Sequence, residues 1–521
     1  MFHVPLYIEG LRSRPLLVFW LATLAQAALW ILVPLLFYAA PPGDLAQLLA
    51  IGHEFPLTGG FGPPLAYWLA EIAFRGAGLF GVYALSQICV ITTYWCVFAL
   101  GRAIVGATHA AMAVLLMVGI SVFTVPTPDF GPPMLAMALW TGVLLFYWRA
   151  VMEGRRRYWY ALGGAAALLL IATDAALILL GALALFTALT ERGRAAVSTI
   201  EAWITGGALI FVLLLHLFWL AGAGAGDGLT PALARLRDAG IAGGNTTAWL
   251  RLLSALLLAH AGLAVLVVLA GGWPRTRAAP APAIARAPVV PFAMTFVKAF
   301  ALIPALLATI VAVLVGHRLP IGGAAPLLVL SGLAVVIAAG DSVELRHQRI
   351  LGFAWAGLLV VPAIFVPAVI VLLPWTTATD LNIAQPAVAM GRFFADSFER
   401  RTGHPLAIVG GDARIAALVA LAAPSRPSVY FAADPERSPW VTAQDIREKG
   451  AVVVWLTADT TPAPPPEIKA HFPDLIPEVP RTFERLVRGR LPPLLIGWGV
   501  IRPANAAAAA PAVPSAEGVP R

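Results

Sequence analysis

Three aspartates stand beside long apolar stretches of the chain, where a carboxylate is costly unless it faces a cavity or has a function. Asp44 lies in PPGDLAQLLAIGHEF, Asp129 in PTPDFGPP and Asp174 in IATDAAL. A group of such carboxylates marks a candidate functional site. Each aspartate also precedes an apolar run that is typical of a helix. Capping of a helix N-terminus is therefore the alternative role.

His53 and Glu54 follow Asp44 closely and form a second group that could do chemistry. Neighbouring residues point in different directions on a helix or a strand, so this pair alone does not make a metal site. Together with Asp44 and His317 the pair could hold a divalent metal ion, although the spacing of an HExxH-type motif is absent. The other interpretations are that the pair shapes a substrate pocket through hydrogen bonds, or that it packs the loop locally.

The composition shows which elements must position these groups. Of 521 residues, 60% are hydrophobic and 12% are charged, whereas soluble proteins have roughly 45–50% and 25%. The formal net charge is +8, but the arginines form short clusters between apolar segments, as membrane topology requires. No basic stripe with interleaved aromatic residues indicates nucleic-acid binding. We therefore expect a mainly α-helical, multi-pass membrane protein that does not bind nucleic acid.

About eleven apolar segments before Trp375 approach the roughly 20 residues that cross a bilayer as a helix. The first exceeds the roughly 7–15 apolar residues of a signal peptide, so we expect it to be retained. The boundary near Thr173 is the least distinct, and fusing the two spans there would invert all later loops. The predicted spans are 16–38, 80–101, 107–124, 133–149, 158–172, 175–190, 202–221, 250–272, 293–316, 325–340 and 350–374.

The distribution of arginines predicts the orientation, because short cytoplasmic loops are rich in Lys and Arg. With a cytoplasmic N-terminus, most arginine clusters fall in inner loops, and Asp44, Asp129 and Asp174 fall in three successive outer loops. The chain after Trp375 then emerges outside. The few arginines left in the outer loops are Arg75, Arg235, Arg237, Arg251 and Arg318. Each could pair with a phosphate, or could extend along the membrane interface as Arg side chains commonly do.

The region after Trp375 changes character. Charge density rises, and short apolar runs alternate with helical ones from 406 to 456. This order of strands and helices predicts a small α/β domain with a parallel sheet. We expect a transmembrane domain at 1–375 with catalytic outer loops near 39–79 and 124–132, an extracytoplasmic α/β domain at 376–502, and a low-complexity disordered tail at 503–521.

The segment GDLAQLLAIGHEFPLTGGFGPPLAYWLAEIAFR resembles the first outer loop of glycosyltransferase family 39, a family of the GT-C superfamily. This family includes the aminoarabinose transferases of lipid A and the protein O-mannosyltransferases. Asp44 matches the first residue of the family's acidic pair, and Leu45 replaces the second. Pro63, Pro64, Leu65 and Trp68 match the Pro-Pro-Leu motif that follows, and Gly62 replaces its usual basic residue.

Two further blocks resemble the same family in the same order. VPTPDFGPPMLAMALWTGVLLFYWRAV is similar to its second outer loop, with Asp129 in the place of the acid. YWYALGGAAALLLIATDAALIL resembles its Gly-rich helix, with Asp174 where a Lys is common. The three blocks cover the first third of the chain, and the rest is similar in architecture.

The resemblance implies an inverting glycosyltransferase of the bacterial inner membrane with a periplasmic C-terminal domain. Its donor would be a sugar on polyprenyl phosphate, and its acceptor an envelope glycolipid or glycan such as lipopolysaccharide. Asp44 would be the general base and Asp129 would assist it. The residues expected to bind substrate are His53, Glu54, Pro63, Pro64, Trp68, Arg75, Asp174, Arg235, Arg237, Arg251, His317 and Arg318. A non-catalytic binder or transporter of polyprenyl-linked substrates is the alternative, although transporters tend to show internal repeats and we find none.

Overall fold

The structure is a computed structural model that describes residues 5–57, 61–222, 243–271, 283–315, 325–344, 348–431, 433–435 and 437–504. The chain divides into two compact units. The first unit comprises Met1–Phe37 and Gly62–Val369, and the second comprises Tyr38–Phe61 and Ile370–Arg521. The first unit is built of apolar helices, and the second combines helices with a sheet. The segment 38–61, which holds Asp44, His53 and Glu54, thus packs with the second unit.

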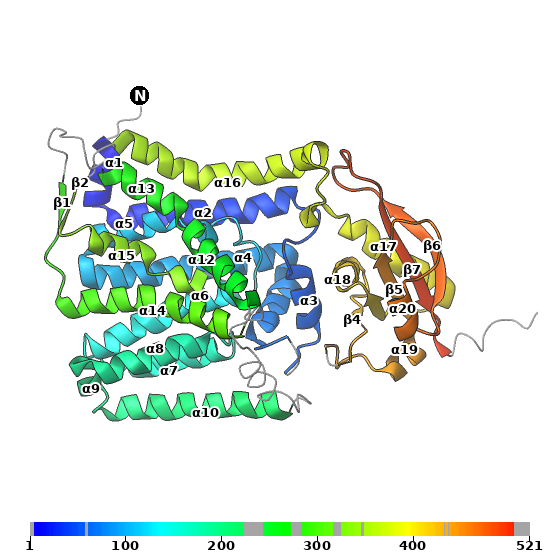
Figure 1. The fold of residues 1–521 in the computed structure, drawn as a ribbon, viewed down its shortest axis with the longest axis horizontal. Helices are drawn as coiled ribbons and strands as arrows, with labels where there is room; N and C mark the ends of the chain where they lie inside the picture. Colours follow the sequence, from blue (N-terminus) through cyan, green and yellow to red (C-terminus); the bar gives the residue numbers. More distant parts are fainter. Residues whose placement is uncertain are drawn as a thin grey trace, which may run out of the picture. The chain divides into compact units, whose positions relative to one another are not determined.

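Apolar helices that lie alongside one another make up the first unit (Figure 1). They form because their sequences are runs of Leu, Ala and Val with few charges, which favour a helix that satisfies its own backbone groups. The helices of this unit are α1 (Pro5–Ser13), α2 (Pro15–Phe37), α4 (Leu65–Val105), α5 (Ala107–Met117), α6 (Pro132–Val151), α7 (Tyr158–Leu170), α8 (Ala176–Leu189), α9 (Glu191–Ala196), α10 (Ile200–Gly222), α12 (Gly243–Ala259), α13 (Ala261–Gly271), α14 (Pro291–Val315), α15 (Ser331–Ala338) and the larger part of α16 (Gln348–Thr376).

Each predicted span overlaps a helix or a pair of short helices, so the prediction of a mainly helical, multi-pass protein is confirmed. Among the described residues, six helices are long and apolar enough to cross a membrane, and six apolar helices are shorter. The uncertain boundary near Thr173 is a turn between α7 and α8, in which the Ala175 amide donates to Thr173 Oγ1 at 3.3 Å. The chain is therefore a multi-pass membrane protein.

Two predicted spans are interrupted, and a third is preceded by a break. In α4 the backbone leaves helical geometry at Ala77 and at Gly78, whose φ is 60°, so a shorter helix precedes the predicted span 80–101. The predicted span 107–124 is helical only to Met117 and continues through the 3-10 turn η1 (Ser121–Phe123). The predicted span 250–272 breaks between α12 and α13 at His260. Another 3-10 turn, η2 (Ala325–Leu328), precedes α15, and a short antiparallel pair joins β1 (Ala283–Ala285) to β2 (Ser342–Glu344).

A five-stranded sheet in the order β4-β3-β5-β7-β6 organises the second unit. The pairs β3–β4 and β3–β5 are parallel, and β7 pairs antiparallel with β5 and β6. The strands are β3 (Ile408–Gly411), β4 (Ser428–Phe431), β5 (Ala451–Leu456), β6 (Ile476–Phe483) and β7 (Leu494–Ile501). The predicted α/β domain with parallel strands is confirmed, and two antiparallel strands extend it.

Helices cover the sheet, and their apolar faces make its core. The α17 and α18 helices pack on the face that carries Val409, Val452 and Val454. Ala46 and Ala50 of the short α3 helix belong to this same core. The helices and turns of this unit are α3 (Leu45–His53), η3 (Asn382–Ala384), α17 (Ala387–Thr402), α18 (Ala413–Ala422), α19 (Ala443–Lys449) and α20 (Pro466–His471).

Candidate functional site

The loop that carries Asp129 is held by buried polar side chains of α4. The Gln87 amide donates to Thr127 Oγ1 at 3.1 Å, and Thr127 Oγ1 donates to the Thr124 carbonyl at 2.7 Å. Ser86 Oγ donates to the Thr127 carbonyl. These four side chains are all no more than 3% exposed. Groups of this kind are costly in apolar surroundings unless they are paired, so their pairing fixes the loop in one conformation.

A second set of contacts ties the start of this loop to α2. The Gln26 amide donates to the Phe123 carbonyl, and the Tyr94 hydroxyl donates to Gln26 Oε1 at 3.2 Å. Gln26 is fully buried in the middle of a candidate membrane span. Polar residues inside spans are rare and mark functional positions. Gln26 thus provides the hydrogen bond for the Phe123 carbonyl, a backbone group that the interrupted helix leaves without an intrahelical partner.

The length of α5 indicates where this loop lies in the membrane. The helix starts directly after α4 ends and has 11 residues, which cover about 16 Å of the roughly 30 Å hydrocarbon layer. The α5 helix alone is therefore too short to cross this layer. Non-helical backbone within the layer is tolerated only where protein buries it or where it lines a cavity. Asp129 is partly buried two residues before Gly131, the N-cap of α6.

Two of the three aspartates are not the N-cap residues of the helices that follow them. The N-cap residue of α6 is Gly131, and that of α8 is Ala175. Asp44 occupies the N-cap position of α3, but its carboxylate makes no cap bond.

The first and third sequence blocks meet at the start of α4. The Leu65 amide donates to the Ile171 carbonyl at 3.1 Å. A methyl group on Gly62, whose φ is 90°, would lie 3.9 Å from Asp174 Oδ2. Pro63 and Pro64 are buried in this turn, whereas Asp174 is exposed. The structure therefore brings Asp174 to the Gly-Pro-Pro motif.

Glu71 is a residue of this region that the sequence reasoning missed. Its side chain is 1% exposed and accepts from Arg75 Nε at 2.8 Å, whereas the Arg75 side chain is 54% exposed. Both lie one to two turns after Trp68, before the break at Ala77. A buried carboxylate paired with a guanidinium holds that guanidinium in one place at the start of α4. The i, i+4 spacing of Glu71 and Arg75 was a usable signal.

Asp44 lies in the second unit, and Arg414 is part of its surroundings. Asp44 is exposed at the start of α3, which packs against α18, the helix that carries Arg414. Burial lowers the pKa of Arg414, and the carboxylates of Asp380, Asp412 and Asp44 oppose this change. Arg414 Nη2 is buried and has no hydrogen-bond partner within the part of the chain that the structure describes. An N–H group of this nitrogen can donate a hydrogen bond to an anionic oxygen.

The other carboxylates near Arg414 already have partners. Arg485 Nε and Nη2 bind Asp380 Oδ1 and Oδ2 at 3.2 and 3.0 Å. Asp412 Oδ1 accepts from the amides of Arg414 and Ile415, and so caps α18. Asp44 is the third acid near Arg414. Among the described residues, the structure shows neither an ion pair nor a helix-capping bond for it.

His53 ends α3 and Glu54 follows it, and both are half-buried. Glu54 Oε1 is buried without a hydrogen-bond partner among the described residues. No group of three or more His, Cys, Asp or Glu side chains that could hold a metal ion occurs in the described ranges. His317, the fourth member of the predicted metal site, lies outside them.

Three of the predicted phosphate contacts also fall outside the described residues, namely Arg235, Arg237 and Arg318. Arg251 is exposed on α12, and Arg75 is exposed on α4. The predicted site residues therefore form separate groups in the two units. In the first unit, Asp129 lies in its own loop, and Asp174 lies near the motif of Pro63 and Pro64. In the second unit, Asp44 lies near Arg414.

Comparisons with known proteins agree with the motifs. Residues 62–219 match the family model of the dolichyl-phosphate-mannose-protein mannosyltransferases. This range includes the second and third blocks and the Pro-Pro-Leu motif, and it begins after Asp44. The sequence finds no match among curated proteins.

Among solved structures, ArnT from Cupriavidus metallidurans bound to undecaprenyl phosphate matches with a TM-score of 0.54 and 12% identity, over 95% of this chain and 98% of that chain. The apo state of the same protein matches with a TM-score of 0.45 and 12% identity, over 96% and 98%. The archaeal oligosaccharyltransferase AglB from Archaeoglobus fulgidus, in complex with an inhibitory peptide and a dolichol-phosphate, matches with a TM-score of 0.45 and 13% identity, over 85% and 70%. The fold assignment rests on the first of these.

Proposed function

We propose that this chain, whose resemblance to the GT-C glycosyltransferases is confirmed in motif and in fold, transfers a sugar from polyprenyl phosphate to an envelope glycolipid or glycan. The transfer would take place at the outer face of the bacterial inner membrane, with the N-terminus cytoplasmic and the second unit periplasmic. The observation that carries the proposal is the match of residues 62–219, in a membrane unit of this fold, to the mannosyltransferase family model.

The reaction follows from the chemistry of the donor. An acceptor hydroxyl oxygen attacks the anomeric carbon, and the bond from that carbon to the phosphate oxygen breaks. The electron pair leaves with polyprenyl phosphate, and the hydroxyl proton goes to the carboxylate of Asp44, with inversion at the carbon. Asp129 orients the acceptor from its fixed loop. No metal ion is required for this balance.

The leaving phosphate needs positive charge to stabilise it. Arg414 supplies a buried guanidinium nitrogen that has no hydrogen-bond partner among the described residues. We assign Arg414 to the phosphate, because a guanidinium binds phosphate oxygens well. Trp68, Pro63, Pro64, Arg75 and Asp174, around the start of α4, and His53 and Glu54, at the end of α3, would contribute further substrate contacts.

A binder or transporter of polyprenyl-linked substrates is the second candidate, and the interrupted helices favour it. The Leu263 amide at the start of α13 donates to the Gly119 carbonyl at 2.8 Å, so two helix breaks meet. A side chain at Gly119 would clash with that backbone, because its Cβ would lie 2.6 Å from Leu263 nitrogen. Broken helices near the membrane midplane are typical of transporters.

Two experiments separate these functions. The gene is deleted and the envelope glycolipids are compared by mass spectrometry; the transferase predicts the loss of one sugar from a defined glycan. Purified protein is then incubated with a polyprenyl-phosphate sugar and an envelope extract, and released polyprenyl phosphate is measured. Release supports a transferase. Donor binding without release supports the second candidate, and an unchanged envelope contradicts the transferase. A periplasmic reporter fused after Trp375 tests the orientation.

A further inference from the structure

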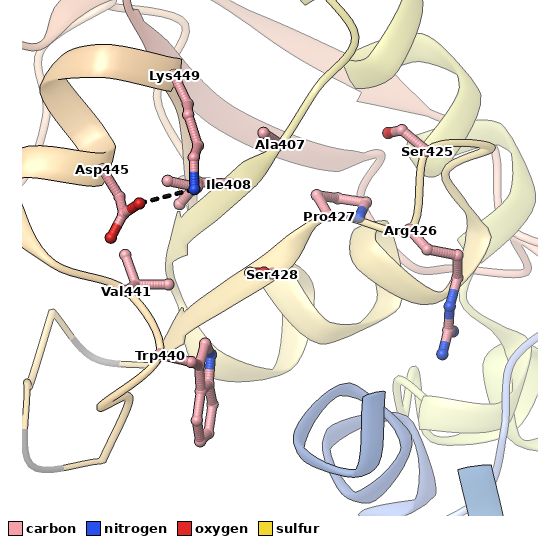
Figure 2. A pocket seen from close by; sticks show the side chains of 10 residues that line it. All are labelled: Ala407, Ile408, Ser425, Arg426, Pro427, Ser428, Trp440, Val441, Asp445 and Lys449. Atoms are coloured by element: carbon pink, nitrogen blue, oxygen red, sulfur yellow. Dashed lines mark hydrogen bonds and ion pairs between the residues drawn. The ribbon is translucent and has the colours of Figure 1, made fainter. Parts of the chain in front are cut away.

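The second unit contains a cavity of about 290 Å³ that no sequence motif predicted (Figure 2). It opens where β3 and β4 begin, between α19 and the turn that joins α18 to β4. Its volume is near the lower end of the roughly 300–1,000 Å³ range of ligand pockets, which suits one ring rather than a chain of rings. The lining residues are Ala407, Ile408, Ser425, Arg426, Pro427, Ser428, Trp440, Val441, Asp445 and Lys449.

The charge of this cavity is positive because its lining holds two cationic side chains, Arg426 and Lys449, and one carboxylate, Asp445. Asp445 Oδ1 accepts from Lys449 Nζ at 2.7 Å, and Oδ2 accepts from the amide and the hydroxyl of Thr442 at 3.0 and 2.5 Å. These bonds hold the pKa of Asp445 at about 2. Lys449 is thereby held beside the cavity (Figure 2), and an ammonium group has three N–H donors.

Trp440 forms a fixed aromatic wall of the cavity (Figure 2). Its Nε1 donates to the carbonyl of Val429 on the edge strand β4 at 3.0 Å. The indole also contacts the rings of Phe61 and Phe431, with centroids 6.2 and 6.4 Å away. A rigid aromatic side chain offers an apolar face without losing conformational entropy when a ligand binds. Such a wall opposite polar groups suits a ligand with an apolar face and a polar rim.

The turn that brings Arg426 to the cavity is strained. Arg426 has a φ of 50° and precedes Pro427, although a residue before proline favours extended backbone. Ser425 Oγ donates to the Leu406 carbonyl at 2.7 Å and anchors the turn. Strained backbone of this kind persists where the surrounding structure fixes it, and it concentrates at ligand sites.

We propose that this cavity binds an anionic monosaccharide unit of the acceptor, carrying a phosphate or a carboxylate. Lys449 would bind the anionic group, and Arg426 would add positive charge at the opposite rim. The hydroxyls of Ser425 and Ser428 would bind the sugar hydroxyls, and the Trp440 ring the apolar face of the sugar. This inference rests on the proposed function, because it gives the second unit the task of recognising the acceptor. It also names the acceptor class as a negatively charged glycan.

Binding is tested on the full chain in detergent micelles, labelled with 5-fluorotryptophan. The ¹⁹F resonance of Trp440 is identified as the one missing from Trp440→Phe. Glucose 6-phosphate or glucuronate should shift this resonance to saturation, and the stronger of the two identifies the anionic group. Glucose and inorganic phosphate should each bind at least tenfold more weakly. No shift with either anionic sugar would overturn the proposal, as would inorganic phosphate binding as tightly as glucose 6-phosphate.

Two variants test the assigned contacts. Lys449→Gln and Arg426→Asn each remove one charge, and Asn tolerates the left-handed backbone at position 426. Each should weaken the binding of the anionic sugar by roughly tenfold. Lys469→Gln, which removes an exposed charge from α20 outside the cavity, should bind as the wild type does. Equal binding by all three variants contradicts the proposal. Because no donor is present, this outcome is independent of the polyprenyl phosphate release that tests the transferase.

Discussion

Two acid-bearing segments of this chain are held in place by opposite means. The loop of Asp129, in the first unit, is fixed by hydrogen bonds from Gln26, Ser86 and Gln87 inside apolar surroundings. The segment of Asp44, in the second unit, is fixed by the apolar packing of Ala46 and Ala50 in the core around α18. The Asp129 loop therefore depends on the pairing of hydrogen-bonding groups, and the Asp44 segment on the fit of apolar side chains.

The difference teaches where each acid can serve. A network of buried hydrogen bonds allows one conformation and strongly penalises its loss, which suits a residue that orients a substrate. The apolar packing of α3 leaves the Asp44 carboxylate exposed, and this packing does not directly depend on whether the carboxylate is charged. A general base must exchange a proton, so the less constrained carboxylate is the better candidate for that role.

The largest effect on stability is expected at Gln26. Gln26→Leu removes the donor to the Phe123 carbonyl and the acceptor of the Tyr94 hydroxyl, and so leaves two buried groups unpaired. Each unpaired group costs about 1–3 kcal/mol. We expect a lower thermal unfolding midpoint in detergent and a loss of transfer activity.

Thr23→Val on the same helix is the matched control. Thr23 is 2% exposed, and its hydroxyl has no hydrogen-bond partner among the described residues. Replacing it with an apolar side chain of similar shape should leave the unfolding midpoint unchanged or raise it. If Thr23→Val lowers the midpoint as much as Gln26→Leu, general crowding in α2 explains the result and hydrogen bonding does not.

Arg414→Gln is expected to affect activity more than stability. The guanidinium has a buried nitrogen without a partner, so the folded state loses little when the charge is removed. The leaving phosphate, however, would lose a charged hydrogen bond of about 1.5–3 kcal/mol, which corresponds to roughly a 10- to 100-fold lower rate. Steady-state kinetics and thermal unfolding of the same preparation measure both quantities. A large fall in stability with unchanged kinetics would show that Arg414 is structural.

Ala46→Leu tests the packing of the Asp44 segment. Ala46 is 4% exposed, and adding methylenes to a packed core costs about 1–3 kcal/mol. Hydrogen exchange followed by mass spectrometry should show faster exchange in α3 and unchanged exchange in 118–131. Gln47→Leu, at the half-buried next position, is the control and should leave α3 protected. Faster exchange in both segments would show that one network holds both acids.

The smallest effect concerns a polar contact at the surface. The hydrogen bonds from Lys449 and Thr442 lower the pKa of Asp445 from 3.8 to about 2. A depressed folded-state pKa gives stability that is present above the unfolded value, and that is lost as the pH falls from about 4 to about 2. We expect α19 to lose protection from hydrogen exchange in that window, by at most about 1 kcal/mol. In Asp445→Asn this pH dependence should disappear.

The sequence predicts much of the fold because apolar length and arginine asymmetry are strong signals. Each of the predicted spans overlaps a helix, and the turn near Thr173 was placed correctly. The breaks after Met117 and at His260 were missed, because they lie within runs that are as apolar as a continuous helix. Only the contacts of Gln26, Gln87 and Gly119 show why the backbone departs from the helix there.

The site was predictable only in part. Asp129 and Asp174 were found as acids at helix borders, and the structure adds that neither is the N-cap residue of the helix that follows. The neighbourhood of Asp44 could not be predicted, because Arg414 and Asp380 lie more than 300 residues away in the sequence. Their meeting depends on the packing of α3 against α18, which no local pattern encodes.

The most direct test of the central claim compares Asp44→Asn with the wild type in the release of polyprenyl phosphate from a purified donor. The amide keeps the shape of the side chain but cannot take a proton. General-base catalysis contributes about 10²- to 10⁴-fold, so kcat should fall by that factor while KM and the unfolding midpoint change little. Release by Asp44→Asn at the wild-type rate would contradict the assignment of Asp44 as the general base.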